Sequence, residues 1–201
     1  MIQGSEEWLN ARAGKITASR FDCIMVNGKD KSGFGKGALS YANEIVTEIL
    51  TSMPVDSFSN NAMDWGTETE PLARLEYKKE TFNNVDEVGF LTLNDWVGCS
   101  PDGLIGSDGG LEVKCPFNST IHLENLISRT IPKKYIPQVQ GCMYVTDRKW
   151  WDFISFDPRY NLGLKIMIVR VERDQDYIDK LKDRIEKFIQ LIKNIKMVVE
   201  G

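Results

Sequence analysis

The chain has 201 residues and a mass of 22.9 kDa, the size of one domain with a substantial core. Its composition is typical of a soluble globular protein, and no apolar run reaches the ~18 residues that a membrane span needs. The net charge of −4 disfavours a protein that passively coats DNA, but it allows an enzyme with a local basic path and an acidic metal site. The polar N-terminus has no signal-peptide pattern, so we expect one domain, 1–201, in the cytoplasm.

The four cysteines form no CxxC pair, which disfavours a zinc ribbon. In a reducing cytosol we expect thiols that serve mostly as small buried residues. They are Cys23, Cys99, Cys115 and Cys142.

The segment GKDKSGFGKG at 28–37 predicts a loop rich in glycine and lysine. It is not a phosphate-binding P-loop, because Gly37 follows Lys36 where Ser or Thr is required. Its lysines are compatible both with contacts to a nucleic-acid backbone and with an ordinary solvated loop.

The first half of the chain predicts two helices followed by strands. LSYANEIVTEIL at 39–50 places its apolar residues on one helical face. The segment 61–82 is helical in composition, and Pro71 must lie in its first turn or kink it. Three short strands are then predicted, at 87–93, 97–105 and 110–116.

The second half predicts a helix at 118–129 that opens with a capping residue, and a helix at 131–146 that Pro137 kinks. Strands follow at 150–157 and 164–172. A long amphipathic helix then runs from Asp174 to about Val199. This order of elements predicts an α/β or α+β fold in which helices cover a sheet.

SPDGLIGSDGGLEVKCP, at 100–116, concentrates acids, glycines and a lysine. If it folds as a hairpin, residues opposite each other sum to about 214, so Asp102 faces Glu112 with Cβ atoms ~5 Å apart. Lys114 then shares the face of Glu112, and Ser100 lies opposite Lys114. A slip of one residue, or a bulge, would break this alignment.

Two facing carboxylates repel each other, and a divalent ion removes the conflict. Hard oxygen ligands suit Mg²⁺ or Mn²⁺. His122 is the one histidine, so a histidine-rich zinc site or a histidine base is disfavoured. Lys114 would instead act near the metal, either with a lowered pKa or as a charged group that steadies water. A solvent-facing polar hairpin and a calcium loop are the alternatives.

The spacing of Asp102, Glu112 and Lys114 resembles the signature of the PD-(D/E)xK nuclease superfamily. The surrounding sequence resembles the phage lambda exonuclease, or YqaJ-type viral recombinase, family. The motifs that carry this resemblance are WLNARAGKITAS at 8–19, DWGTETE at 64–70, CSPDGL at 99–104, GLEVKCPF at 110–117, PQVQGCMYVT at 137–146 and FDPR at 156–159.

The resemblance implies a restriction-endonuclease-like core, a central mixed β-sheet flanked by α-helices. It implies a Mg²⁺-dependent 5′-to-3′ exonuclease on linear double-stranded DNA that prefers 5′-phosphorylated ends. Two Mg²⁺ ions are expected, with Mn²⁺ as a substitute. The 3′ tails would go to a single-strand annealing protein in recombination, and the enzyme would form a ring-shaped homotrimer. A phage or prophage gene acting in a bacterial host cytosol is expected.

By resemblance, Asp102 and Glu112 bind the metals together with the carbonyl of Val113, and Lys114 serves the nucleophilic water. Glu70 matches a further acidic ligand by its spacing from Trp65, and Glu68 is the nearby competitor for that role. Three carboxylates would suffice for a two-metal arrangement.

The resemblance also implies a pocket for the 5′-phosphate, in which Arg12 grips the phosphate with its guanidinium. Ser19, Ser100 and Gln138 are the expected polar supports. From the residues alone, an ordinary surface arginine is the default interpretation of Arg12, and Ser19 is equally a helix cap. Gln140 competes with Gln138 for the role in the pocket. Lysines that could line the inner face of the ring are Lys29, Lys31, Lys36 and Lys133.

Other functions remain as alternatives. One is a restriction-type or structure-specific endonuclease of the same superfamily. An iron–sulfur nuclease is disfavoured because no late cysteine cluster accompanies Cys23. The other is a non-catalytic DNA-binding module, which would have no need for the set of acids and the lysine.

Overall fold

The computed structural model describes the chain except residues 30, 56–60 and 162. Position 30 belongs to the predicted 28–37 loop and lies outside the described residues. The elements, in chain order, are α1 (Glu6–Arg12), β1 (Ile16–Thr17), the 3₁₀ helix η1 (Ala18–Arg20), α2 (Phe21–Met25), α3 (Lys36–Thr51), α4 (Asn61–Thr81), β2 (Leu91–Thr92), β3 (Val97–Cys99), β4 (Gly103–Ile105), β5 (Gly109–Lys114), α5 (Ser119–Ser128), the 3₁₀ helix η2 (Lys133–Tyr135), α6 (Ile136–Thr146), β6 (Trp150–Phe156), β7 (Ile166–Glu172) and α7 (Gln175–Glu200).

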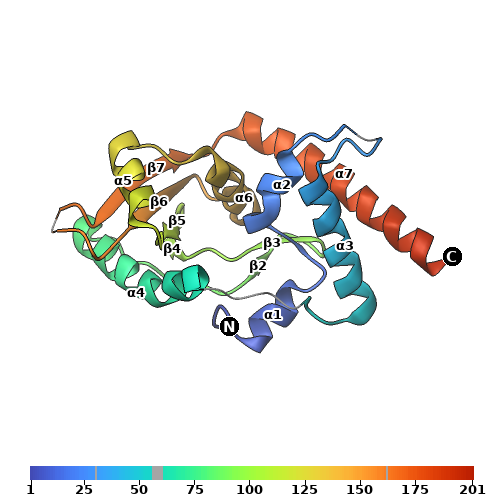
Figure 1. The fold of residues 1–201 in the computed structure, drawn as a ribbon, viewed down its shortest axis with the longest axis horizontal. Helices are drawn as coiled ribbons and strands as arrows, with labels where there is room; N and C mark the ends of the chain where they lie inside the picture. Colours follow the sequence, from blue (N-terminus) through green and yellow to red (C-terminus); the bar gives the residue numbers. More distant parts are fainter. Residues whose placement is uncertain (30, 56–60, 162) are drawn as a thin grey trace.

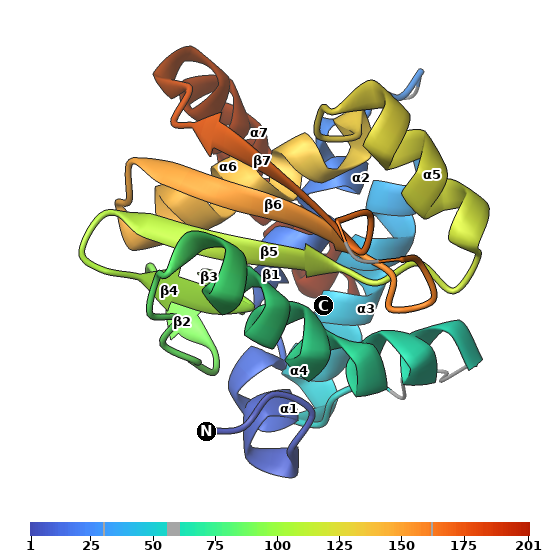
Figure 2. The same cartoon turned by 90° about the vertical axis from the view of Figure 1, so that its left-hand side faces the viewer.

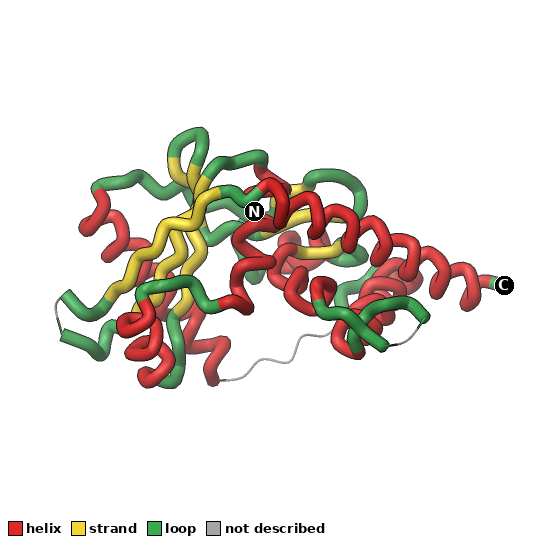
Figure 3. The backbone as a smooth tube through the Cα atoms, turned by 90° about the horizontal axis from the view of Figure 1, so that it is seen from above, coloured by secondary structure: helices red, strands yellow, loops and turns green. Residues whose placement is uncertain are grey.

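The described strands form two sheets, as Figure 1 shows. A small sheet has the order β1-β3-β2, and a larger one has the order β4-β5-β6-β7. In the larger sheet β5 runs parallel to β6, while the β4–β5 and β6–β7 pairs are antiparallel. The fold is therefore the mixed α/β arrangement that the order of elements predicts, with helices around the sheets (Figure 3).

Helices cover both faces of the larger sheet. In Figure 2, α4 crosses in front of this sheet and α6 lies behind it. On β5, Leu111 and Val113 pack with Ala73 and Tyr77 of α4 in one apolar cluster. Because side chains alternate along a strand, Glu112 and Lys114 point to the other face, toward α6. The alternation of side chains along β5 thus places Glu112 and Lys114 between β5 and α6.

Two glycines allow β5 to lie close against β6. A Cβ atom at Gly110 would lie 2.3 Å from ring atoms of Trp151, and one at Gly109 would lie 2.1 Å from the ring of Trp150. Any larger residue would have to displace an indole ring. The Gly-Gly pair that precedes Leu111 therefore keeps the strand that carries Glu112 and Lys114 packed against its neighbour.

Most predicted elements are confirmed, including α3, α4, α5, β6, β7 and the long α7. The predicted strand 97–105 is wrong as one element, because it breaks at Ser100–Asp102 into β3 and β4. Pro71 lies in the interior of α4 and not in its first turn. Pro137 lies in the first turn of α6, so it starts this helix without interrupting it. A missing amide hydrogen costs nothing there, since first-turn amides have no intrahelical acceptor.

The four cysteines are unpaired thiols, as expected. Cys99 and Cys142 are buried, and Cys23 and Cys115 are half-buried. Within the described residues, no helix combines the length and the apolar character needed to cross a bilayer.

Candidate active site

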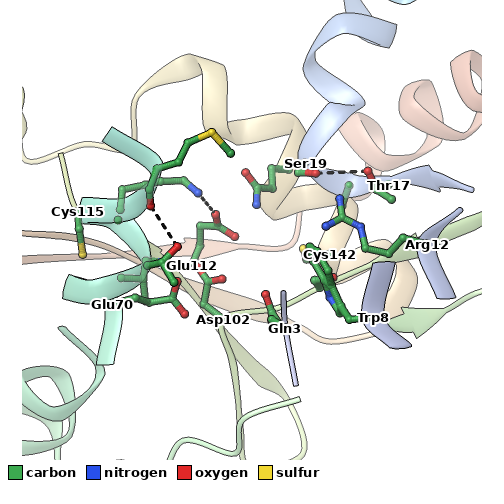
Figure 4. A pocket seen from close by; sticks show the side chains of 18 of the residues that line it. Gln3, Trp8, Arg12, Thr17, Ser19, Glu70, Asp102, Glu112, Cys115 and Cys142 are labelled. Carbon is green, nitrogen blue, oxygen red and sulfur yellow. Dashed lines mark hydrogen bonds and ion pairs between the residues drawn. The ribbon is translucent and has the colours of Figure 1, made fainter. Parts of the chain in front are cut away.

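A pocket of about 540 Å³ opens between β5, α4, α6 and the N-terminal segment. Figure 4 shows Glu70, Asp102 and Glu112 gathered on one side of it, with Trp8, Arg12 and Ser19 on the other. All nine residues that the sequence predicts for the metal and phosphate sites line this one pocket. They are Arg12, Ser19, Glu70, Ser100, Asp102, Glu112, Val113, Lys114 and Gln138.

The acid side of the pocket is built by the β4–β5 hairpin. Its pairs are Gly103 with Leu111, Leu104 with Gly110 and Ile105 with Gly109, so the predicted sum of 214 is confirmed. The ladder ends at Gly103, however, and Asp102 lies in the bend beyond it. Its Oδ2 accepts a hydrogen bond from the amide of Val113, at 2.6 Å. The predicted strand pairing of Asp102 with Glu112, and of Ser100 with Lys114, is therefore wrong, although all four residues line the pocket.

Glu112 is fully buried and forms an ion pair with Lys114. Neither of its carboxylate oxygens accepts a well-formed hydrogen bond from the described residues. Burial raises the pKa of Glu112 to about 8, and the negative charge of Asp102 adds to the rise while Lys114 opposes it. Burial alone would lower the pKa of Lys114, but the attraction of Glu112 and Asp102 outweighs it and the pKa is raised.

Glu70 reaches the same side of the pocket from α4. Burial raises its pKa to about 7, with a further rise from the charge of Asp102. Burial also raises the pKa of Asp102, against the positive charges of Lys114 and Arg74. Glu68, the competing acid, is exposed and does not line the pocket. The structure thus brings Glu70, and not Glu68, to Asp102 and Glu112.

The donor set of this acid side fits a hard divalent cation. Carboxylates that are costly to ionise inside a protein become favourable when a cation neutralises them, and two oxygens of Glu112 lack hydrogen bonds. Each of the three carboxylates interacts with a group of the protein. Asp102 accepts a hydrogen bond from the amide of Val113, Glu112 pairs with Lys114, and Glu70 pairs with Arg74. Accordingly, no three His, Cys, Asp or Glu side chains among the described residues form a ready-made metal cluster.

The opposite side of the pocket carries Arg12. Its guanidinium carbon lies 3.9 Å from the ring centroid of Trp8, a stacked cation–π arrangement one helical turn along α1. Burial lowers the pKa of Arg12. Glu48 acts on Arg12 from a distance, but its carboxylate accepts hydrogen bonds from the amides of Gly14 and Val55. No carboxylate in the described part of the chain forms an ion pair with Arg12, so this half-buried cation is suited to an anionic ligand.

Polar side chains line the same pocket as Arg12. Ser100 accepts a hydrogen bond from the indole nitrogen of Trp8, at 2.9 Å, which leaves its own hydroxyl hydrogen to donate. The hydroxyl of Ser19 lies 3.3 Å from that of Thr17. Ser19 does not cap a helix, because Arg20 is the N-cap residue of α2. The alternative cap interpretation of Ser19 is therefore wrong.

Gln138 and Gln140 differ in their surroundings. Gln138 lines the pocket. Gln140 is buried elsewhere, where it donates to the carbonyl of Glu172 at 2.9 Å and accepts from the amide of Asp174. Both polar atoms of the Gln140 side chain thus bind the backbone just before α7. Of the two glutamines, only Gln138 lines the pocket.

The FDPR motif, at 156–159, contacts two segments next to the acid side of the pocket. Asp157 is buried and accepts hydrogen bonds from Ser119 and from the side chain of Arg159. Arg159 also donates to the carbonyls of Pro116 and Phe117, both at 3.1 Å, and its guanidinium lies 4.5 Å from the ring centroid of Trp65. The motif therefore ties the chain just after Lys114 to the helix that carries Glu70.

Sequence reasoning missed two pocket residues with identifiable roles. Trp8 could have been found, because it lies four residues before Arg12, the spacing of neighbours on a helix. Gln3 donates to the carbonyl of Pro101 at 2.8 Å and so anchors the bend that holds Asp102. No local pattern indicates that contact, which joins residues 98 positions apart. The four lysines proposed for the ring, Lys29, Lys31, Lys36 and Lys133, are exposed and lie outside the pocket.

Comparisons with known proteins agree with this architecture. The chain superposes on an alkaline exonuclease (LHK-Exo) from Laribacter hongkongensis with a TM-score of 0.89 and 34% sequence identity, over 98% of this chain and 96% of that one. The same values hold for LHK-Exo in complex with dAMP. A phage-related exonuclease from Haemophilus somnus 129PT, at 18% identity and a TM-score of 0.72 over 93% of this chain and 99% of that one, shares the fold. The comparison with curated proteins gives no match.

The fold is restriction-endonuclease-like, with a mixed sheet flanked by helices. The family model of the YqaJ-like viral recombinase domain matches residues 7–149. The chain belongs to this family.

Proposed function

We propose that the chain is a metal-dependent deoxyribonuclease that removes nucleotides from the 5′ ends of linear double-stranded DNA. The observation that supports this proposal best is the polarity of the pocket. Three carboxylates and Lys114 lie at one side. Arg12, which lies over the ring of Trp8 and has no ion pair among the described residues, lies at the other. A terminal phosphate held by Arg12 would place the next phosphodiester near the acids, which is the geometry of an end-directed nuclease.

The metal side of this proposal consists of Asp102, Glu112, Glu70 and the carbonyl of Val113. Mg²⁺ is the expected ion, with two ions bound and Mn²⁺ able to substitute, because the donors are hard oxygens. Bound Mg²⁺ supplies charge stabilisation at the reacting phosphate and lowers the pKa of coordinated water. Burial raises the pKa values of Glu70, Asp102 and Glu112, and a bound cation would favour their ionised forms.

Lys114 is proposed to serve the nucleophilic water. As an ammonium group it has hydrogen-bond donors and no acceptor, so in this form it orients the water and stabilises charge on the phosphate. Its pairing with Glu112 and its position beside the ring of Tyr135, 5.2 Å from the centroid, fix its direction.

The phosphate side is proposed to consist of Arg12, Ser19, Ser100 and Gln138. A guanidinium can engage two phosphate oxygens at once, and the hydroxyl and amide groups add neutral donors. The solved relative LHK-Exo binds dAMP, a mononucleotide. By analogy, a nucleoside 5′-monophosphate is the proposed product of this chain, and a 5′-phosphorylated end is its preferred substrate.

The remaining parts of the proposal concern partners. Removal of the 5′-ended strand leaves a 3′ single-stranded tail, which a single-strand annealing protein would take up in recombination. Membership of a viral recombinase family supports this role. We further propose a ring-shaped homotrimer around the DNA, lined by exposed lysines such as Lys29, Lys31, Lys36 and Lys133, working in the cytoplasm of a bacterial host. Light scattering of the purified protein tests the trimer.

Product analysis tests the proposed polarity. A linear duplex labelled at the 5′ end of one strand is incubated with Mg²⁺, and an identical closed circular duplex serves as the control. The proposal predicts that the label is released first, as a mononucleotide, and that the circle stays uncut. Internal cutting of the circle would indicate an endonuclease, and binding without products would indicate a DNA-binding module.

A further inference from the structure

Arg74 connects the acid side of the pocket to the protein surface. It lies four residues after Glu70 on α4, and only 13% of its side chain is exposed. One terminal nitrogen, Nη1, pairs with Oε1 of Glu70. The other, Nη2, pairs with Oε2 of Glu87 at 2.9 Å. Glu87 precedes β2, and 65% of its side chain is exposed. One guanidinium therefore bridges a pocket carboxylate and a surface carboxylate.

This bridge has a direct consequence for Glu70. A glutamate has several rotatable bonds, and its carboxylate would otherwise avoid the like charges of Asp102 and Glu112. The ion pair with Arg74 engages Oε1 and does not engage Oε2, so one oxygen is fixed while the other is left as a possible ligand. Because Glu87 holds the far side of the guanidinium, Arg74 is itself restrained in direction.

We propose that Arg74 is the positioning residue for Glu70, and that its two-sided guanidinium, anchored by Glu87, holds the carboxylate in the orientation in which it completes the metal-binding set. The inference rests on the proposed metal-dependent function and assigns Arg74 no contact with the DNA. Partners that orient ligating carboxylates matter nearly as much as the ligands, because a free carboxylate must be ordered each time the ion binds. The planar guanidinium is suited to this task, since its nitrogens point in fixed, divergent directions.

The test compares Arg74→Lys with the parent chain. Lysine retains the positive charge but has a single nitrogen, which cannot hold Glu70 and Glu87 in the same geometry. Mn²⁺ alone, without DNA, is titrated into the protein by calorimetry. We expect the dissociation constant for Mn²⁺ to rise about tenfold or more. We expect the melting temperature in EDTA to stay within about 4 °C, and the preference for 5′-phosphorylated ends to persist, because Arg12 lies on the other side of the pocket.

Two further variants separate positioning from general helix stability. Glu87→Gln removes only the outer anchor, at an exposed position, and should weaken Mn²⁺ binding in the same direction but by less. Glu76→Gln is the matched control, because it breaks another ion pair of α4, with Lys79 at 3.3 Å, outside the pocket. Its Mn²⁺ affinity should equal that of the parent.

Each outcome bears on the inference. Parental Mn²⁺ affinity in Arg74→Lys overturns it, and so does weakened affinity in Glu76→Gln to the same extent. If Arg74→Lys fails to fold, the result with Glu87→Gln decides, and an unchanged affinity there rejects the positioning role. A parent chain that binds no Mn²⁺ and degrades no DNA would instead refute the proposed function, and the inference with it. A parent that is active while Arg74→Lys binds Mn²⁺ normally refutes the inference alone.

Discussion

Asp102 accepts a hydrogen bond from the backbone amide of Val113, with 2.6 Å between Oδ2 and the nitrogen. Val113 separates Glu112 from Lys114 in the sequence, so this one contact fixes the first acid against the strand that carries the second acid and the lysine. A hydrogen bond to a carboxylate is stronger than one between neutral groups. The hydrogen bond to Val113 thus brings Asp102 next to the two residues, Glu112 and Lys114, with which it shares the sequence motif.

Lys114→Ala should reduce cleavage by about 10²-fold or more and leave DNA binding nearly unchanged, because the lysine serves the reacting water and not the duplex. Cleavage of linear duplex and binding by fluorescence anisotropy are the measurements. Lys134→Ala is the matched control, since Lys134 also lies beside the ring of Tyr135, at 4.8 Å, but does not line the pocket. Near-parental cleavage by Lys114→Ala would show that its assigned role is wrong.

The hairpin illustrates how much of the site could be predicted from sequence. The glycine-rich turn and the alternation of Leu111 and Val113 with Glu112 and Lys114 determine the register, and it is confirmed. The same logic fails at Asp102, because a ladder position cannot be extrapolated past the last paired residue, Gly103. The carboxylate instead meets a backbone amide, which no side-chain pattern indicates.

The parts that could not be predicted depend on contacts between distant segments. The bridge from Glu70 through Arg74 to Glu87 joins α4 to the segment before β2, and exposed Glu87 has no sequence feature that sets it apart. The predicted kink at Pro137 is wrong, because a proline is equally compatible with the first turn of a helix, which is where it lies. The helical character of 61–82 outweighed Pro71, since the apolar contacts of Ala73 and Tyr77 stabilise α4 on the sheet.

Arg12→Ala should abolish the preference for 5′-phosphorylated over 5′-hydroxyl ends. The guanidinium is the one group of the phosphate side that carries charge, so its loss should equalise the two ends by slowing the phosphorylated one. Initial rates on two otherwise identical duplexes give the ratio. Arg20→Ala is the control, because Arg20 already pairs with Glu44 at 3.0 Å. A preference that survives in Arg12→Ala at its parental size would remove Arg12 from the pocket's function.

Stability without metal should depend on pH in a way that identifies the buried acids. Burial raises the pKa of Glu112 from 4.5 to about 8 and that of Glu70 from 4.5 to about 7. A carboxyl group with a higher pKa in the folded chain binds its proton more tightly there, so the stability it contributes is present below pH 4.5 and is lost as the pH rises through the folded pKa.

In EDTA, the melting temperature should therefore fall between about pH 5 and pH 8. Glu112→Gln should show a shallower fall, because its amide does not titrate, and saturating Mg²⁺ should flatten the dependence of the parent by favouring the ionised acids. Circular dichroism at several pH values measures both slopes. Equal slopes for the parent and Glu112→Gln would contradict the assignment of a buried, titrating Glu112.

Ca²⁺ should bind to the acid side but fail to support turnover. Its larger radius and irregular coordination suit carboxylate oxygens yet relax the geometry that Mg²⁺ imposes. Calorimetry of Ca²⁺ binding and cleavage with Ca²⁺ in place of Mg²⁺ provide the two readouts, and Mn²⁺ is the positive control. Robust degradation of DNA in Ca²⁺ would count against the two-Mg²⁺ proposal.

The most direct test of the central claim uses one linear duplex with a 5′-phosphate at one end and a 5′-hydroxyl at the other. It is digested by the parent chain with Mg²⁺, by the parent with EDTA, and by Asp102→Ala with Mg²⁺. The account predicts loss of the 5′-ended strand from the phosphorylated end, only in the parent with Mg²⁺. Digestion that persists in Asp102→Ala or in EDTA, or that begins equally at both ends, would contradict it.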